Sequence, residues 1–251
     1  MVLKNHSSMS TKQSFSSLML QFEHRYDLRT AFDDFLTLSL CSLSINPLTR
    51  KSFDEDLYMD TILKYEKDDL RHLFPEAFAQ IVLEMEARKG SSQGNDVLGD
   101  FYQEHLYRKG ASQFFTPWSV CEMMAKITCA EETEKVLNIL DPTCGSGRML
   151  LASAFELGGN HNYYGIDIDS SCVRMTAITL FLNSIFHGEV MCADSLKPDD
   201  FRCSYKFSIL PLGVRLITEK ENSTLWHLHK NSFTKTNAEN EKQKGKQIRL
   251  F

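Results

Sequence analysis

The sequence lacks the features that mark membrane-spanning, secreted and zinc-binding proteins. No apolar run approaches the roughly 18 residues that span a bilayer, and the N-terminus has no continuous apolar stretch like that of a signal peptide. The seven cysteines are odd in number and include no C-x-x-C pair, which argues against a disulfide framework and a zinc knuckle. These absences predict a cytoplasmic protein with no membrane partner and no metal site.

The sequence also lacks an excess of basic residues. Lys and Arg number 28 against 33 Asp and Glu, so the formal net charge is −5. A chain with this balance has no global positive field to hold nucleic acid, and any such binding must be local or depend on a partner. Its 251 residues, 42% of them hydrophobic, are enough for one large or two small domains with a core.

The first part of the chain has the apolar spacing of helices, and we predict a small helical domain over residues 18–110. Two helical faces carry the apolar side chains, namely Phe32, Phe35, Leu36, Leu40 and Leu43 on one and Phe74, Ala77, Phe78, Ile81, Val82 and Met85 on the other. Two glycines in the polar segment 90–95 predict a loop. The Ser-rich residues 1–17 show almost no periodicity, which predicts a disordered tail.

From about residue 111 short apolar runs alternate with helical stretches. Strands are predicted at 136–140, 163–166, 190–192 and 207–210, and helices around 120–127 and 170–186. This alternation predicts an α/β fold over residues 111–218, with a parallel sheet and crossover helices. Residues 219–251 are polar, with seven basic residues against four acidic ones, and are expected to form a solvated basic tail.

The segment DPTCGSG, residues 141–147, is the most informative feature of the sequence. It lies directly between the apolar run VLNIL and the helical run RMLLASAFEL. A strand, a tight glycine turn and a helix in this order let the backbone approach a ligand closely beneath a helix N-terminus. The pattern predicts a nucleotide-like cofactor site, with a plain strand-to-helix turn as the alternative.

Acidic residues follow the next two predicted strands. Asp167 lies 20 residues after Gly147, where a carboxylate can accept hydrogen bonds from two ribose hydroxyls. Asp194 follows the third strand, within reach of an adenine amino group. An NAD-linked Rossmann enzyme shares the glycine loop and the ribose acid and stays an alternative, although the Asp-Pro start of the loop and the segment FFTP count against it.

Several segments together resemble the N6-adenine DNA methylases, above all the methylation subunits of type I restriction–modification systems. They are DVLGDFYQEHL, GASQFFTPWSV, LDPTCGSGRMLL, YYGIDIDSS and CADSL, in this order. The resemblance covers roughly residues 95–212. It implies a Rossmann-like class I methyltransferase core preceded by a small helical domain, S-adenosylmethionine as cofactor, and DNA bound through a complex with a specificity or methylase subunit.

The same resemblance assigns cofactor contacts. The residues it implies are Phe115, Thr116, Pro117, Asp141, Pro142, Cys144, Gly145, Gly147, Asp167, Ile168 and Asp194. The segment around Thr116 matches the part that closes over the methionine moiety, and the loop after Asp141 matches the methionine-binding turn. Ile168 matches the residue that packs on adenine. Core packing explains Phe114 and Phe115 equally well, and Asp169 is expected to cap a helix.

The resemblance fails at the catalytic motif. Adenine N6 is a weak nucleophile, and the family places Asn-Pro-Pro-Tyr or Asn-Pro-Pro-Phe after the fourth strand to accept its hydrogens and stack on the flipped base. Here that position reads Leu210-Pro211-Leu212-Gly213. Leu210 has no acceptor and Gly213 has no stacking face, so no catalytic residue is assigned.

The chain also resembles a core truncated after its fourth or fifth strand, without room for a target-recognition domain. Such a truncation is expected to leave an apolar edge open to a partner or to self-association. Two interpretations remain: a DNA adenine-N6 methyltransferase homologue with impaired catalysis, or a non-catalytic S-adenosylmethionine-binding or interaction protein.

Overall fold

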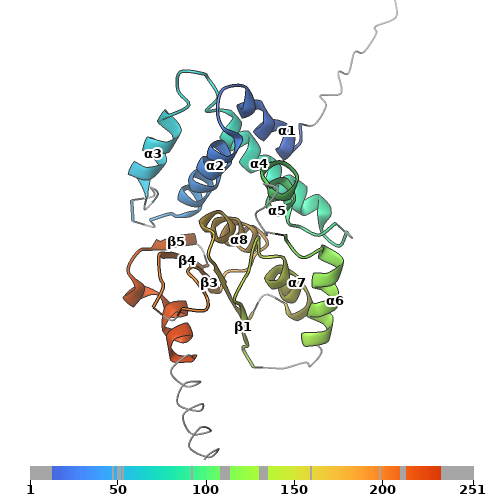
Figure 1. Ribbon diagram of the computed structural model, residues 1–251. Helices are drawn as coiled ribbons and strands as arrows, with labels where there is room; N and C mark the ends of the chain where they lie inside the picture. Colours follow the sequence, from blue (N-terminus) through green and yellow to red (C-terminus); the bar gives the residue numbers. More distant parts are fainter. Residues whose placement is uncertain are drawn as a thin grey trace, which may run out of the picture.

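The protein is described by a computed structural model in which one group of helices lies over a five-stranded sheet (Figure 1). The described residues are 13–46, 48–49, 52, 54–91, 93–107, 114–129, 135–158, 160–197, 199–209 and 213–232. Among them, no helix is long and apolar enough to cross a membrane.

The N-terminal part is helical, as the apolar spacing predicts. Its elements are α1 (Phe15–Met19), η1 (Leu20–His24), α2 (Leu28–Leu43), α3 (Glu55–Leu63), α4 (Leu73–Arg88), α5 (Val97–Phe101) and the π-helical turn η2 (Tyr102–Leu106). An aromatic cluster joins η1 to α4, in which the Phe22 ring lies 4.7 Å from that of Phe74. This cluster is continuous with the core under the sheet, so the two parts of the chain share one hydrophobic core.

The prediction of a disordered tail over residues 1–17 is wrong for its last three residues, 15–17, which are helical. Helix α1 begins at Phe15, whose side chain is fully buried and whose backbone N–H donates to Glu84 at 2.7 Å. A single turn of helix carries too few residues for its periodicity to show in the sequence. Residues 1–12 lie outside the described residues.

The second part confirms the α/β class. Its elements are α6 (Trp118–Thr128), β1 (Asn138–Asp141), α7 (Arg148–Leu157), β2 (Asn162–Asp167), α8 (Ser170–Leu182), β3 (Gly188–Cys192), β4 (Cys203–Ser208) and β5 (Gly213–Ile217). The strands lie in chain order in the sheet. As predicted, β1, β2 and β3 pair in parallel and are joined by helices.

The fourth strand departs from the predicted parallel sheet. β4 pairs antiparallel with β3 and with β5. A parallel crossover needs a dozen or more residues. The connection between β3 and β4, residues 193–202, is shorter than that and its described residues form no helix, so the chain turns back on itself.

The predicted C-terminal tail is also partly wrong. A 3₁₀ turn, η3 (Lys220–Asn222), leads into residues 224–232, which are helical. Leu225 and Trp226 are buried against residues of β2 and β3, on the opposite side of the sheet from the main core. Two apolar side chains among many charged ones were too weak a signal to predict this. Residues 233–251 lie outside the described residues.

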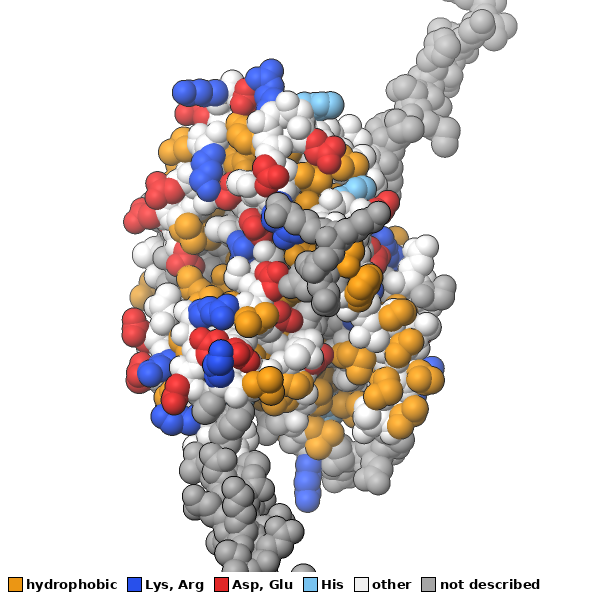
Figure 2. Space-filling view, viewed as in Figure 1, with side chains coloured by type: hydrophobic (Ala, Val, Ile, Leu, Met, Phe, Trp, Pro, Cys, Tyr) orange, Lys and Arg blue, Asp and Glu red, His pale blue; other side chains and the backbone are white. Residues whose placement is uncertain are grey.

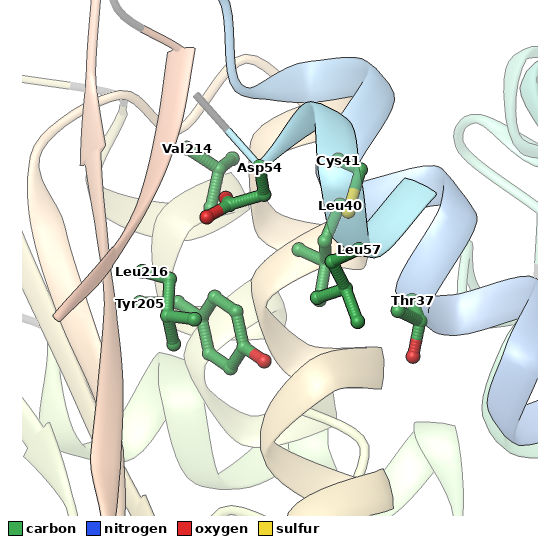
Figure 3. Close-up of a pocket in the computed structure, with 8 residues that line it drawn as sticks. All are labelled: Thr37, Leu40, Cys41, Asp54, Leu57, Tyr205, Val214 and Leu216. Atoms are coloured by element: carbon green, nitrogen blue, oxygen red, sulfur yellow. The ribbon is translucent and has the colours of Figure 1, made fainter. Parts of the chain in front are cut away.

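The helical part meets the far edge of the sheet at a small hollow of about 280 Å³. Figure 3 shows side chains of α2 and α3 facing those of β4 and β5 across it. The lining residues are Thr37, Leu40, Cys41, Asp54, Leu57, Tyr205, Val214 and Leu216. Burial raises the pKa of Asp54 and raises that of Cys41 to about 12. These mostly apolar walls form a packing seam, and no residue of the glycine loop reaches it.

Candidate cofactor site

The three predicted carboxylates lie at one edge of the sheet. Asp141 ends β1, Asp167 ends β2 and Asp194 is the second residue after β3. These strands are parallel, so their carboxyl ends meet at the same edge. Backbone hydrogen bonds continue past the strands, from Cys144 N–H to the Ile166 carbonyl and from Ala193 N–H to the Asp167 carbonyl, both 2.9 Å. The loops that carry the candidate residues are therefore held side by side.

The glycine loop has a conformation that depends on its glycines. Gly145 and Gly147 have φ angles of 56° and 90°, in the left-handed region that favours glycine. A Cβ atom on Gly147 would lie 2.9 Å from Cγ2 of Thr176 on α8. The Thr176 hydroxyl also donates to the Gly145 carbonyl at 2.8 Å. Helix α8 therefore fixes the turn that starts α7.

The carboxylate of Asp167 is part of this loop. Its two oxygens accept hydrogen bonds from the backbone N–H groups of Gly145, at 2.8 Å, and Asp169, at 2.9 Å. Each carboxylate oxygen keeps a second lone pair for a ligand. The Asp169 side chain accepts from Ser171 N–H at 2.8 Å, which confirms the predicted helix cap.

The electrostatics of this edge favour a positively charged ligand. Burial raises the pKa of Asp167, and burial together with the nearby Asp167 charge raises the pKa of Asp141. Among the described residues, neither carboxylate forms an ion pair. A cation placed between them would relieve this repulsion, whereas an anion would add to it.

The segment FFTP closes over the glycine loop. A hollow of about 310 Å³ is lined by Phe114, Phe115, Thr116, Asp141, Thr143, Cys144, Gly145, Ser146, Arg148 and Met149. A Cβ on Gly145 would lie 2.9 Å from the Phe115 ring. Core packing does not explain Phe114, which is 77% exposed. Phe115 is half-buried and packs on the Tyr102 ring, so it contacts both the core and the hollow.

A buried ion pair that the sequence did not predict supports the loop. Asp96, which is 2% exposed, accepts hydrogen bonds from Arg148 Nε at 2.6 Å, from Gly99 N–H at 2.8 Å and from the Ser146 hydroxyl. Burial raises the pKa of Asp96, and these donors oppose that effect. Arg148 also binds Asp100 at 2.7 Å and the Thr116 carbonyl at 3.3 Å. One guanidinium thus connects α5, the segment FFTP and the glycine loop.

The remaining predicted contacts lie at the rim. Ile168 is 56% exposed at the same edge, and Pro142 is exposed outside the hollow. The Asp194 carboxylate accepts from Lys197 Nζ and from Leu196 N–H, both at 3.0 Å, and these contacts lower its pKa. Pro117 begins α6 as its N-cap. The binding roles of all these residues stay predictions.

Comparison with known proteins decides the family. A family model described as N-6 DNA Methylase matches residues 93–240. The chain belongs to the N-6 DNA methylase family. It is 26% identical over 176 residues to the "Type I restriction enzyme MjaVIII methylase subunit" of Methanocaldococcus jannaschii, a match that covers 65% of this chain and 29% of that protein. The chain therefore spans less than a third of that relative's length.

A solved structure is also similar to this chain. It is the type I restriction–modification system methyltransferase subunit from Streptococcus thermophilus, at 16% sequence identity and a TM-score of 0.40, over 75% of this chain and 60% of that one.

The position of the family's catalytic motif is unusual in this chain. Residues 210–212 lie outside the described residues, and Gly213 begins β5. Gly213 has a φ of 64°, and a Cβ there would lie 1.9 Å from the Leu43 carbonyl oxygen, so this position requires glycine.

Antiparallel pairing moves this position away from the three carboxylates. Ser208 at the end of β4 pairs with Gly213, and Phe207 pairs with Gly188 at the start of β3. Asp194 lies beyond the other end of β3. Five residues of strand extend about 16 Å, so Gly213 and Asp194 lie at opposite ends of the sheet.

Proposed function

We propose that this chain binds S-adenosylmethionine as the cofactor-binding part of a type I DNA adenine-N6 methylase and transfers no methyl group by itself. The observation that carries the proposal is the acidic strand edge, by which we mean the edge of the sheet where Asp141 and Asp167 lie beside the glycine loop. This edge falls within the segment that matches the family. The degenerate motif and its place at the other end of the sheet support the second half of the proposal.

The residues present fit this cofactor chemically. S-adenosylmethionine carries two positive groups, an ammonium and a sulfonium, and Asp141 would hold this charged end beside the hollow under Phe115 and Thr116. Asp167 would accept the ribose hydroxyls, with Ile168 against the adenine and Asp194 accepting from its amino group. When bound, the cofactor supplies an activated methyl group.

The NAD-linked alternative fits poorly. NAD carries a pyrophosphate, which the Rossmann loop places at the helix N-terminus. Here the loop begins with Asp141, whose pKa is already raised by burial and by Asp167. A second pair of negative charges at this point is unfavourable, because like charges repel strongly where water is partly excluded.

Replacing Asp167 with alanine is expected to weaken S-adenosylmethionine binding by roughly 1.5–3 kcal/mol, or about 10- to 150-fold, because the ribose loses a charged acceptor. Equilibrium dialysis with radiolabelled cofactor measures the change. Asp60→Ala removes an exposed carboxylate on α3 and serves as the control. Equal affinity of Asp167→Ala and wild type would remove the ribose assignment.

Replacing Asp141 with asparagine is expected to raise the Tm of the ligand-free protein at pH 7. The pKa of Asp141 is raised on folding, so its ionised form costs stability once the pH exceeds the ordinary value of about 3.9 and passes the raised one. The asparagine retains the acceptor for Thr143 N–H, 3.0 Å away. For wild type, cofactor affinity should fall as the pH drops through the raised pKa.

Thermal unfolding with and without S-adenosylmethionine tests both effects of Asp141. Wild type should gain Tm on adding the cofactor, and Asp141→Asn should start higher and gain less. A lower ligand-free Tm in the variant, or an undiminished gain, would contradict the electrostatic account of this site.

We also infer that a second methylase chain docks beside β1. Among the described strands β1 has a neighbour only on its β2 side, whereas the first strand of a doubly wound sheet has neighbours on both sides. Figure 2 shows hydrophobic side chains gathered over α6. Its exposed face carries Val120, Met123, Met124 and Ile127 at helical spacing.

DNA binding is expected to depend on such a complex. The net charge of −5 leaves the isolated chain with weak, salt-sensitive and sequence-independent affinity at most. A specificity subunit would supply the recognition of a target sequence.

A further inference from the structure

Two cysteines face each other at the end of the sheet that carries the candidate cofactor site. Cys192 is the last residue of β3 and Cys203 the first of β4, and they are register partners in the antiparallel pair. Directly opposed residues in such pairs have Cα atoms about 4.5 or 5.5 Å apart. Both spacings fall within the 4.4–6.8 Å range of disulfides, and opposed side chains lie on the same face of the sheet.

The two thiols also interact. The neighbouring Cys203 thiol and Arg202 lower the pKa of Cys192 to about 7, whereas the neighbouring Cys192 thiol and burial raise the pKa of Cys203. Burial instead raises the pKa of other cysteines, to about 11 for Cys121 and about 12 for Cys41. The thiolate is the nucleophilic form of cysteine, so this pair differs from them in reactivity.

The surroundings of the pair place it next to the cofactor edge. The Cys192 sulfur lies 3.7 Å from the Ile168 carbonyl oxygen, to which Arg202 also donates at 2.7 Å. Cys192 is 2% exposed, whereas Cys203 is partly exposed and opens the pair to a small oxidant. Neither cysteine forms a disulfide in the structure.

We propose that Cys192 and Cys203 form a reversible disulfide in the presence of hydrogen peroxide. The Cys192 thiolate attacks one peroxide oxygen, giving a sulfenic acid and releasing hydroxide. The Cys203 sulfur then attacks the sulfenic sulfur, which forms the S–S bond and releases water. Two thiols are oxidised and one peroxide is reduced, and a dithiol reductant reverses the reaction.

The disulfide would join the end of β3 to the start of β4, two residues before Asp194. Asp194 is the predicted acceptor for the adenine amino group, so cross-linking is expected to change S-adenosylmethionine affinity. This consequence rests on the proposed function, whereas formation of the disulfide does not.

Peptide mapping by mass spectrometry after peroxide treatment of the full chain tests the proposal. Wild type should yield a cross-linked peptide pair containing Cys192 and Cys203, lost on adding dithiothreitol. In the Cys203→Ser variant, which cannot form the disulfide, dimedone should trap a sulfenic acid at Cys192 faster than at Cys129, because Arg202 still lies beside the Cys192 sulfur and favours its thiolate. Cys129 is a partly exposed free cysteine after α6 and serves as the internal control.

Two results would overturn the proposal. One is peroxide-treated wild type in which both cysteines stay reduced or oxidise separately to sulfinic acids. The other is dimedone trapping at Cys192 no faster than at Cys129. A cross-linked pair with unchanged cofactor affinity would confirm the disulfide and refute only its effect on the candidate site.

Discussion

Replacing Arg148 with alanine is expected to lower the free energy of unfolding by about 3–5 kcal/mol, because it leaves the Asp96 carboxylate buried without its charged partner. Asp96 is 2% exposed and Arg148 8% exposed, so water cannot replace the lost contact. The same guanidinium binds Asp100 and the Thr116 carbonyl, which adds to the cost. Urea unfolding followed by circular dichroism measures the change.

Two further variants separate the buried ion pair from a general loss of packing. Arg148→Ala combined with Asp96→Asn removes both charges and should recover part of the lost stability. Arg88→Ala breaks the more exposed contact with Asp100, where the side chains are 22% and 42% exposed, and should cost less than about 1 kcal/mol. An Arg148→Ala variant within 1 kcal/mol of wild type would show that the helical part does not depend on this pair.

The wild-type chain is expected to transfer no detectable methyl group to unmodified DNA. A missing preorganised acceptor costs roughly 2.7–4 kcal/mol, or 100- to 1000-fold in rate, and the missing stacking face a further ~1–3 kcal/mol. In this chain Leu210 and Gly213 stand at those positions. Gly213 also lies at the opposite end of the sheet from Asp194, so restoring side chains is not enough.

The catalytic variant must therefore leave Gly213 unchanged. Gly213→Phe would push its Cβ into the Leu43 carbonyl and disturb β5. Leu210→Asn with Leu212→Pro keeps the glycine, and we expect this pair to stay inactive. The assay follows tritiated methyl transfer, with the chain alone and with methylase and specificity subunits added. Robust transfer by the isolated wild type would refute the non-catalytic assignment.

The parts of the site that depend on neighbouring residues could be predicted from the sequence. Asp141, the loop glycines and Asp167 could be identified because each lies where a predicted strand ends and a helix follows. Their parallel strands bring them to one edge of the sheet, as expected. The predicted cap at Asp169 depends only on residues two positions away. Such local patterns are enough to predict both the α/β fold class and the sheet edge that forms the candidate cofactor site.

Features that depend on distant residues could not be predicted. The direction of β4 follows from the short connection after β3, whereas apolar runs report only that a strand exists. Trp226 is buried against the apolar side chains on one face of β2 and β3. The residues next to Trp226 in the sequence give no sign of this contact. Asp96 and Arg148 are 52 positions apart and meet only through the packing of α5 on the loop.

The central claim is that the acidic strand edge binds S-adenosylmethionine, and calorimetric titration of the purified chain tests it most directly. We predict a single binding site for S-adenosylmethionine and no measurable heat of binding with NAD under the same conditions. The absence of heat with S-adenosylmethionine, or tighter binding of NAD, would contradict the account.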